Sequence, residues 1–247
     1  MPGPGPDAEI PENIERFDAN GDVILVVSDQ LPENTRRFLV SSKVLGLASS
    51  VFAKLFGPNF HEGIKLQNHT CPEVDLHGDD PAAMGAMVGI LHYQEPNEIV
   101  RTDAQWLSTL AVQCDKYDCG KALGGWISAW LNQFQSIKTP EDYGNLILAA
   151  YLFRHAEHFS RFTLQAQLSL PPDFALKWEE SEIMKRLPDR VKWNLTDRIE
   201  ELLSTMQRDL QSVEASLRYD QKGYAMQATT ESRNISPPYG AQNCGRR

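Results

Sequence analysis

Residues 21–56 carry the pattern that most constrains the fold of this 247-residue chain. An apolar run at residues 23–27 is followed by a polar stretch that contains Pro32, and a second short apolar run occupies residues 38–40. Two β-rich runs separated in this way predict a hairpin. The apolar residues that come next recur at spacings of three and four, which is the helix period. They are Val44, Leu45, Ala48, Phe52, Leu55 and Phe56.

Ser49 interrupts this helical pattern. A serine hydroxyl accepts a hydrogen bond from a free backbone amide in the first turn of a helix, so serine is a preferred N-cap. The sequence therefore predicts a hairpin followed by a pair of short helices, the second of which begins after Ser49.

This arrangement resembles the beginning of a BTB/POZ domain. The motif residues of that family stand here as Asp22-Val23, Phe38-x-Val40, Val44-Leu45 and Ser49-x-x-Phe52-x-x-Leu55-Phe56, with Ser41 where the family often has His. A second segment, LAVQCDKYDCGKAL at residues 110–123, is similar to a stretch of fungal-type BTB proteins, as is Leu91-His92-Tyr93. The resemblance covers residues 18–135 and implies an α+β fold in which a small sheet is flanked by helices.

Proline-containing caps mark further helices along the chain. Asp80 followed by Pro81 predicts one helix start, and Thr139 followed by Pro140 predicts another, because proline suits the first helical position. Thr102 and Gln105 have the spacing of a capping box. Residues 73–76 are expected to add a short strand to the sheet.

Composition changes along the chain define the expected domain organisation. Residues 1–17 are rich in proline and glycine and are expected to be flexible. The BTB/POZ core is expected at residues 18–135, followed by an α-helical extension at 139–221 with a long helix at 188–221. Residues 222–247 turn polar and are expected to be a disordered tail.

Charge and hydropathy exclude some classes of partner. The formal net charge of −9 argues against non-specific nucleic-acid binding, which needs a basic surface. No apolar run approaches the length of a membrane span, and the first residues lack the basic start and apolar core of a secretory signal. We therefore expect an intracellular protein, cytoplasmic or nuclear, whose cysteines are reduced thiols.

No arrangement of residues typical of catalysis is found. The chain has neither a G-x-S-x-G elbow nor a phosphate-binding G-x-x-x-x-G-K-[ST] loop. His155 and His158 lie three residues apart but lack a visible third metal ligand, so we interpret them as part of a solvated helix face. The remaining candidate ligands are interpreted as a polar loop, and they are His61, His69, Cys71 and His77. No metal, no other cofactor and no enzymatic activity are expected.

Two sets of apolar residues have a helical spacing. The first set is Trp106, Trp126 and Trp130, which we interpret as core residues rather than as a ligand cage. The second set has a coiled-coil period of alternating fours and threes, and it consists of Ile199, Leu203, Met206, Leu210, Val213 and Leu217. These residues would form a seam between helices, either with a second chain or with the chain's own domain.

The resemblance also implies residues that bind a partner. BTB adaptors grip a cullin scaffold partly through a loop motif of apolar-x-Glu after the Ser-x-x-Phe helix, and Phe60 and Glu62 match that motif. The family also uses a Tyr at the end of the following helix, which Tyr93 matches, although Gln94-Glu95 replace the usual Thr-Gly. The alternatives are that Phe60 closes the core under the loop and that Tyr93 packs at the helix end, the interpretation we favour for Tyr93.

The expected function is a non-catalytic protein-protein interaction module, an adaptor that links a target protein to a cullin-type ubiquitin ligase. One alternative is a self-associating BTB scaffold with no ligase link, and a less favoured one is an enzyme in the helical half, residues 140–221. Many BTB domains dimerise through an extra N-terminal helix and strand, for which the proline-rich start leaves little room. A homodimer through the core or through the seam stays an open alternative.

Overall fold

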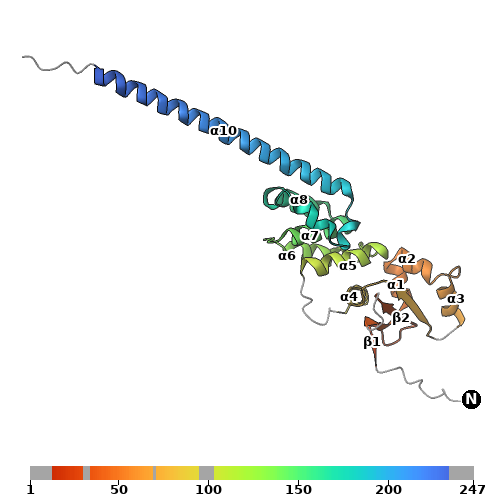
Figure 1. The fold of residues 1–247 in the computed structure, drawn as a ribbon. Coiled ribbons are helices and arrows are strands. Elements are labelled where there is room, and N and C mark those ends of the chain that lie inside the picture. Colours follow the sequence, from red (N-terminus) through yellow and green to blue (C-terminus); the bar gives the residue numbers. More distant parts are fainter. Residues whose placement is uncertain (1–12, 30–33, 69–70, 95–102, 234–247) are drawn as a thin grey trace, which may run out of the picture. The chain divides into compact units, whose positions relative to one another are not determined.

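The computed structural model describes residues 13–29, 34–68, 71–94 and 103–233. The chain divides into two compact units, residues 1–196 and residues 197–247, which are described separately. The first unit contains a sheet and short helices, drawn from red through green to cyan in Figure 1. The second unit contains most of the long helix α10, and the predicted domain boundary at residues 135–139 therefore lies inside the first unit.

A small mixed sheet forms the β part of the first unit. Its strands are β1 (Ile14–Arg16), β2 (Val23–Ser28), β3 (Arg36–Val40) and β4 (Glu73–His77), in the spatial order β1-β3-β2-β4. The β2–β3 pair is antiparallel, which confirms the predicted hairpin, and the two outer strands each pair in parallel with an inner neighbour. The described residues thus have an α+β fold.

Strand β1 was not expected from the sequence. It lies within the segment predicted to be flexible, residues 1–17, and pairs with β3 at the edge of the sheet. Its position is fixed by the next residue: the Phe17 ring packs 5.6 Å from the ring of Phe38, and the Gln94 amide donates to the Phe17 carbonyl at 2.7 Å. The prediction was wrong for residues 14–17 because long-range packing, not local propensity, orders them.

Two short helices follow the hairpin, as predicted. They are α1 (Ser42–Ala48) and α2 (Ser50–Leu55), and Ser49 accepts a hydrogen bond from the Phe52 amide as the N-cap of α2. Ser41 caps α1 in the same way. The carboxylate of Asp22 accepts from both the amide and the hydroxyl of Ser42, which ties α1 to the start of β2.

Two further helices complete the sheet-bearing part: α3 (His61–Asn68) and α4 (Pro81–Leu91). Asp80 caps α4 and Pro81 occupies its first turn, as predicted. Helix α4 is apolar on almost all sides and lies against β2 and β3, where Gly85 leaves room for the Phe38 ring. Helix α3 was not predicted, and the Phe60–Glu62 motif at its start was expected to lie in a loop.

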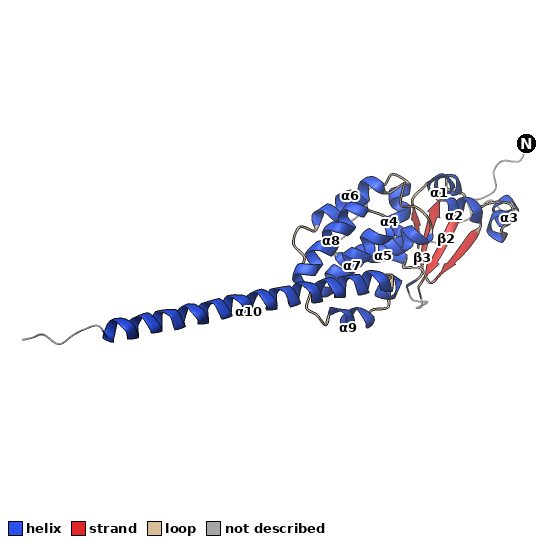
Figure 2. Cartoon of the chain, turned by 90° about the horizontal axis from the view of Figure 1, so that it is seen from above, coloured by secondary structure: helices blue, strands red, loops and turns tan. Residues whose placement is uncertain are grey.

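The remaining elements of the first unit are helical. They are α5 (Ala104–Lys116), α6 (Gly124–Gln133), α7 (Pro140–Leu152), α8 (Ala156–Ser169), α9 (Phe174–Glu179) and the 3₁₀ helix η2 (Ile183–Arg186). Helix α5 packs more extensively on α7 than any other two elements pack on each other, and α7 also packs on α8, as Figure 2 shows. Helix α7 therefore shares a core with α5 on one side and with α8 on another.

The caps of these helices test the predicted starts. Thr139 caps α7, and Pro140 follows it, as expected. Helix α5 is capped by Asp103, whose carboxylate accepts from the Trp106 amide, and Thr102, the predicted cap, lies outside the described residues. Asp103 and Thr102 are both good caps, so residue type alone did not separate them.

Helix α10 spans Asp189–Arg233 and supplies the second unit from residue 197 onwards. The long helix was predicted, but its end was placed near residue 221. The segment at residues 222–233 is helical rather than disordered, and the predicted tail is described only up to that point.

Candidate functional site

The candidate interaction surface is the start of α3, which we name the α3 face and define as Phe60 and Ile64. Glu62 is half-buried and lies on a different side of the helix, because it is two residues from each of them. The side chains of Phe60 and Ile64 are 47% and 46% exposed. The Phe60 carbonyl accepts from the Ile64 amide at 3.0 Å, so the two residues are one helical turn apart and share a side of the helix. Phe60 therefore does not close the core, and its motif opens a helix rather than lying in a loop.

Gly63 holds the α3 face against the preceding turn. A Cβ atom at this position would lie 1.8 Å from the carbonyl oxygen of Gly57, so only glycine allows the two backbone segments to approach so closely. This close approach fixes the backbone between Phe60 and Ile64 against the turn at Gly57.

Tyr93 occupies a different kind of position. It follows the C-terminus of α4 with a φ of 57° and is 96% exposed, so it does not pack at the helix end, contrary to the interpretation favoured from the sequence. Within the described residues, no hydrogen bond or ring contact joins Tyr93 to Phe60 or Glu62. Phe60 and Tyr93 are thus exposed and Glu62 is half-buried, and none of these contacts joins Tyr93 to the other two.

His92, beside Tyr93, has a structural role. Its Nε2 accepts from the Ser41 amide at 3.0 Å, and its Nδ1 lies 2.8 Å from the Val88 carbonyl. These bonds require a neutral ring with the proton on Nδ1, and burial lowers the pKa of His92. The ring thereby joins the end of β3 to α4.

The two segments that carry the resemblance meet in a cluster that we name the Tyr117 clamp, comprising Ser49, Phe52, Asp79, Lys116 and Tyr117. The rings of Phe52 and Tyr117 stack at 4.5 Å. The Ser49 hydroxyl donates to the Tyr117 carbonyl. Helix α2 is therefore attached to the end of α5 by an aromatic stack and by a hydrogen bond.

Asp79 forms the polar part of the clamp. It is 1% exposed and accepts from the Lys116 ammonium and from the Tyr117 hydroxyl, each at 2.6 Å. A buried carboxylate needs such partners because its desolvation is costly. Burial, and next the hydrogen bond to Asp79, raise the pKa of Tyr117, so its hydroxyl stays a donor. This cluster was not predicted from the sequence, since no local pattern links residues 38 positions apart.

The described cysteines are poor nucleophiles. Cys114 and Cys119 are buried, and burial raises the pKa of both thiols, that of Cys119 to about 11. Cys71 is exposed, but partial burial and the charges of Asp22 and Glu73 raise its pKa as well. All three are free thiols, as expected, and Cys244 lies outside the described residues.

His155 and His158 belong to a hydrogen-bonded chain rather than to a solvated helix face. The Ser128 hydroxyl lies 3.2 Å from Nε2 of His155, the Nδ1 atoms of the two histidines lie 3.0 Å apart, and Nε2 of His158 lies 3.0 Å from Oδ1 of Asn132. His158 is 3% exposed. If both rings are neutral, each of these three hydrogen bonds has one donor and one acceptor. Burial, then the charge of Arg161, lowers the pKa of His158.

Metal ligation finds no support in the described part of the chain, where no three His, Cys, Asp or Glu side chains gather around one point. His77 was one of the candidate metal ligands in the sequence. Its Nδ1 lies 3.2 Å from the Ser28 hydroxyl. His69 lies outside the described residues.

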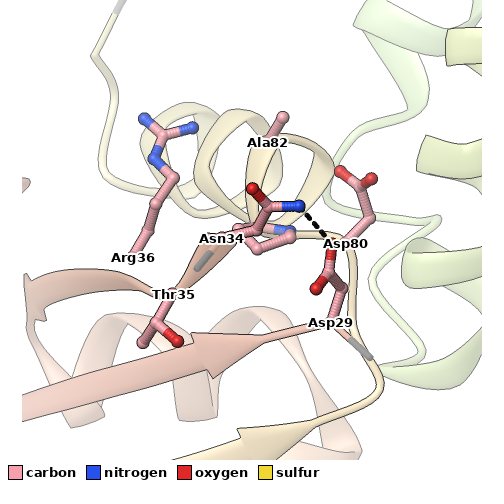
Figure 3. Close-up of a pocket in the computed structure, with 7 residues that line it drawn as sticks. Asp29, Asn34, Thr35, Arg36, Asp80 and Ala82 are labelled. Atoms are coloured by element: carbon pink, nitrogen blue, oxygen red, sulfur yellow. Dashed lines mark hydrogen bonds between the residues drawn. The ribbon is translucent and has the colours of Figure 1, made fainter. Parts of the chain in front are cut away.

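A polar pocket of about 400 Å³ lies between the hairpin and the start of α4 (Figure 3). The Asn34 amide donates to the Asp29 carboxylate at 2.9 Å, Asp80 caps α4, and Arg36 pairs with Glu15. These polar groups are already engaged in holding the fold. The lining residues are Asp29, Asn34, Thr35, Arg36, Asp80, Pro81 and Ala82.

The tryptophan set forms an aromatic cluster. Trp130 is 6% exposed and contacts Trp106 edge-on at 5.7 Å and Trp126 at 5.9 Å. Trp126 is 41% exposed, so the core interpretation holds for Trp130 and not for Trp126.

The predicted seam is exposed over most of its length. Ile199 is buried, whereas the exposed fractions of the later residues lie between 46% and 67%. Those residues are Leu203, Met206, Leu210, Val213 and Leu217.

Comparison with known proteins adds no assignment: no family model matches the chain, and a search of curated proteins finds no match. Among the described helices, none combines the length and the apolar character that crossing a membrane requires.

Proposed function

We propose that this chain is a non-catalytic protein-interaction module of the BTB/POZ type, which acts as an adaptor between a target protein and a cullin-type ubiquitin ligase. The observation that supports this proposal is the α3 face. Phe60 is exposed immediately before α3 and Glu62 is half-buried in its first turn, whereas the neighbouring motif residue Phe52 is buried.

The α3 face has the physical properties of an interface anchor. Aromatic side chains dominate the energetics of protein interfaces. Because Gly63 packs α3 closely on Gly57, the backbone that carries Phe60 is ordered before binding, which lowers the entropic cost of association. Glu62 lies in the first turn of α3, and its charge would contribute mainly to association rate and register.

Binding of a purified cullin scaffold to the full chain tests the proposal. Phe60→Ala should weaken binding roughly 30-fold, the equivalent of about 2 kcal/mol for a hot-spot aromatic. Glu62→Ala should have a smaller effect that shrinks as salt is added. The matched control is Leu168→Ala on α8, which removes a side chain that is 75% exposed and should leave binding unchanged.

The self-associating scaffold is the second candidate. This hypothesis would replace the adaptor proposal if the wild-type chain binds no cullin and has the mass of a dimer by light scattering. The enzyme alternative has a separate test, since stoichiometric zinc in purified protein, measured by mass spectrometry, would revive it.

A further inference from the structure

The exposed part of α10 presents an apolar stripe, which we name the α10 stripe and define as Leu203, Met206, Leu210, Val213 and Leu217. Each side chain is at least 46% exposed, and Leu202 beside them is 38% exposed. Spacings of three and four place all five on one side of the helix. A contiguous apolar surface of this kind marks a site of interaction rather than a solvated face.

The charges beside the stripe define what it can accept. With Leu203, Leu210 and Leu217 at heptad position a, the flanking e and g positions carry no Lys or Arg. Arg208 and Arg218 lie away from the seam, although Arg218 pairs with Glu214 at 2.5 Å. That pair is exposed on both sides, so it leaves most of the Glu214 charge in solvent. The flanking residues are Gln207, Asp209, Glu214 and Ser216.

A second copy of the chain fits this stripe poorly. In a parallel pair, the g position faces the e position of the next heptad, which places Asp209 opposite Glu214 of the second chain twice. In an antiparallel pair that matches Leu203 with Val213, the two copies of Asp209 face each other. A shift by one heptad in one direction leaves Leu203, and in the other direction Leu217, without an apolar partner in the stripe. Like charges across a helix pair are destabilising.

We propose that the α10 stripe binds an amphipathic helix of another protein that has apolar residues at heptad spacing and Lys or Arg beside them. Such a helix buries the five apolar side chains and places its cations next to Asp209 and Glu214. The net charge of −9 favours its approach over that of an acidic helix. This inference goes beyond the adaptor proposal, because it requires neither a cullin nor the α3 face.

Two synthetic peptides with the same apolar seam test the charge requirement, one with Lys at every e and g position and one with Glu. Binding of each labelled peptide to the full chain is measured by fluorescence anisotropy at low and high salt. The Lys peptide should bind at least tenfold more tightly at low salt, and the difference should shrink at high salt.

Variants of exposed residues localise the binding. Leu210→Asp should abolish binding of the Lys peptide, and Asp209→Lys combined with Glu214→Lys should reverse the preference between the peptides. Leu168→Asp on α8 is the matched control, since its side chain is 75% exposed, and should leave binding unchanged. Circular dichroism checks that each variant keeps its helix content.

Three results would overturn the proposal. They are failure of the Lys peptide to bind, equal binding of the two peptides, and binding that Leu210→Asp does not reduce. A dimer by light scattering that Leu210→Asp converts to a monomer would identify a second copy as the occupant instead. Since no cullin takes part, none of these outcomes depends on the adaptor proposal.

Discussion

The Tyr117 clamp and the α3 face each contain a phenylalanine from residues 49–62, but the two side chains have different roles. Phe52 is fully buried and stacks on Tyr117, whereas Phe60, a few residues later, is 47% exposed. Two aromatic residues only eight positions apart therefore have different environments, one inside the core and one open to solvent. Substitutions should separate these two environments by their effect on stability.

The largest expected effect is that of Phe52→Ala. Removing a fully buried ring leaves a cavity and ends the stack on Tyr117, and we expect a loss of about 3–5 kcal/mol of unfolding free energy. Urea denaturation followed by circular dichroism measures it. A loss below about 1 kcal/mol would contradict the structural role of the clamp.

Tyr117→Phe should have an intermediate effect, because it keeps the ring and removes only the hydroxyl that donates to Asp79. The buried carboxylate then has Lys116 as its remaining charged partner, and a loss of about 1–3 kcal/mol is expected. Tyr143→Phe is the matched control, since Tyr143 is also buried and its hydroxyl is not part of the clamp. An equal loss in both variants would remove the hydrogen bond to Asp79 as the cause.

A smaller effect is expected from pH in the helical part of the first unit. The pKa of His158 is lowered in the folded chain, so the unfolded chain binds more protons as the pH falls below the ordinary value of about 6.5. The unfolding free energy should therefore decrease as the pH is lowered, and it should become constant below the pKa of His158 in the folded chain. His158→Gln should flatten this dependence, and the lowered pKa of His92 should leave a residual slope of the same sign. A steeper slope in His158→Gln would contradict the neutral histidine chain.

Phe60→Ala should change stability least. Truncating an exposed side chain away from the core changes the unfolding free energy by no more than about 0.5 kcal/mol. The contrast with Phe52→Ala, measured by the same denaturation, is the sharpest test of the division between clamp and face. Equal losses in the two variants would show that Phe60 also holds the fold.

Local patterns predicted a large part of the fold. The hairpin, the helix pair and the caps at Ser49, Asp80 and Thr139 were all read correctly, because turn residues, helix period and capping chemistry act over a few residues. Helix α3 was missed because a short polar segment with an internal glycine has little helical signal of its own.

The interactions that define the site were less predictable. Phe60 and Glu62 were identified through a resemblance, and the sequence did not show whether Phe60 is exposed. The hydrogen bond of Tyr117 to Asp79 depends on how helices pack, and so does the hydrogen bond between His158 and Asn132. Hydrophobic periodicity does not encode such packing. Strand β1 was missed for the same reason, since its partner β3 lies beyond the hairpin turn.

The packing of α5 on α7 has a consequence for how the chain opens. Helix α7 buries nearly one whole side against its neighbours, so exposing the amides of α5 to solvent requires α7 to detach as well. In hydrogen-exchange terms, these two helices should report one shared, slow opening event. The amides of α10 at residues 203–219, whose side chains are exposed, should exchange by local fraying at much lower cost.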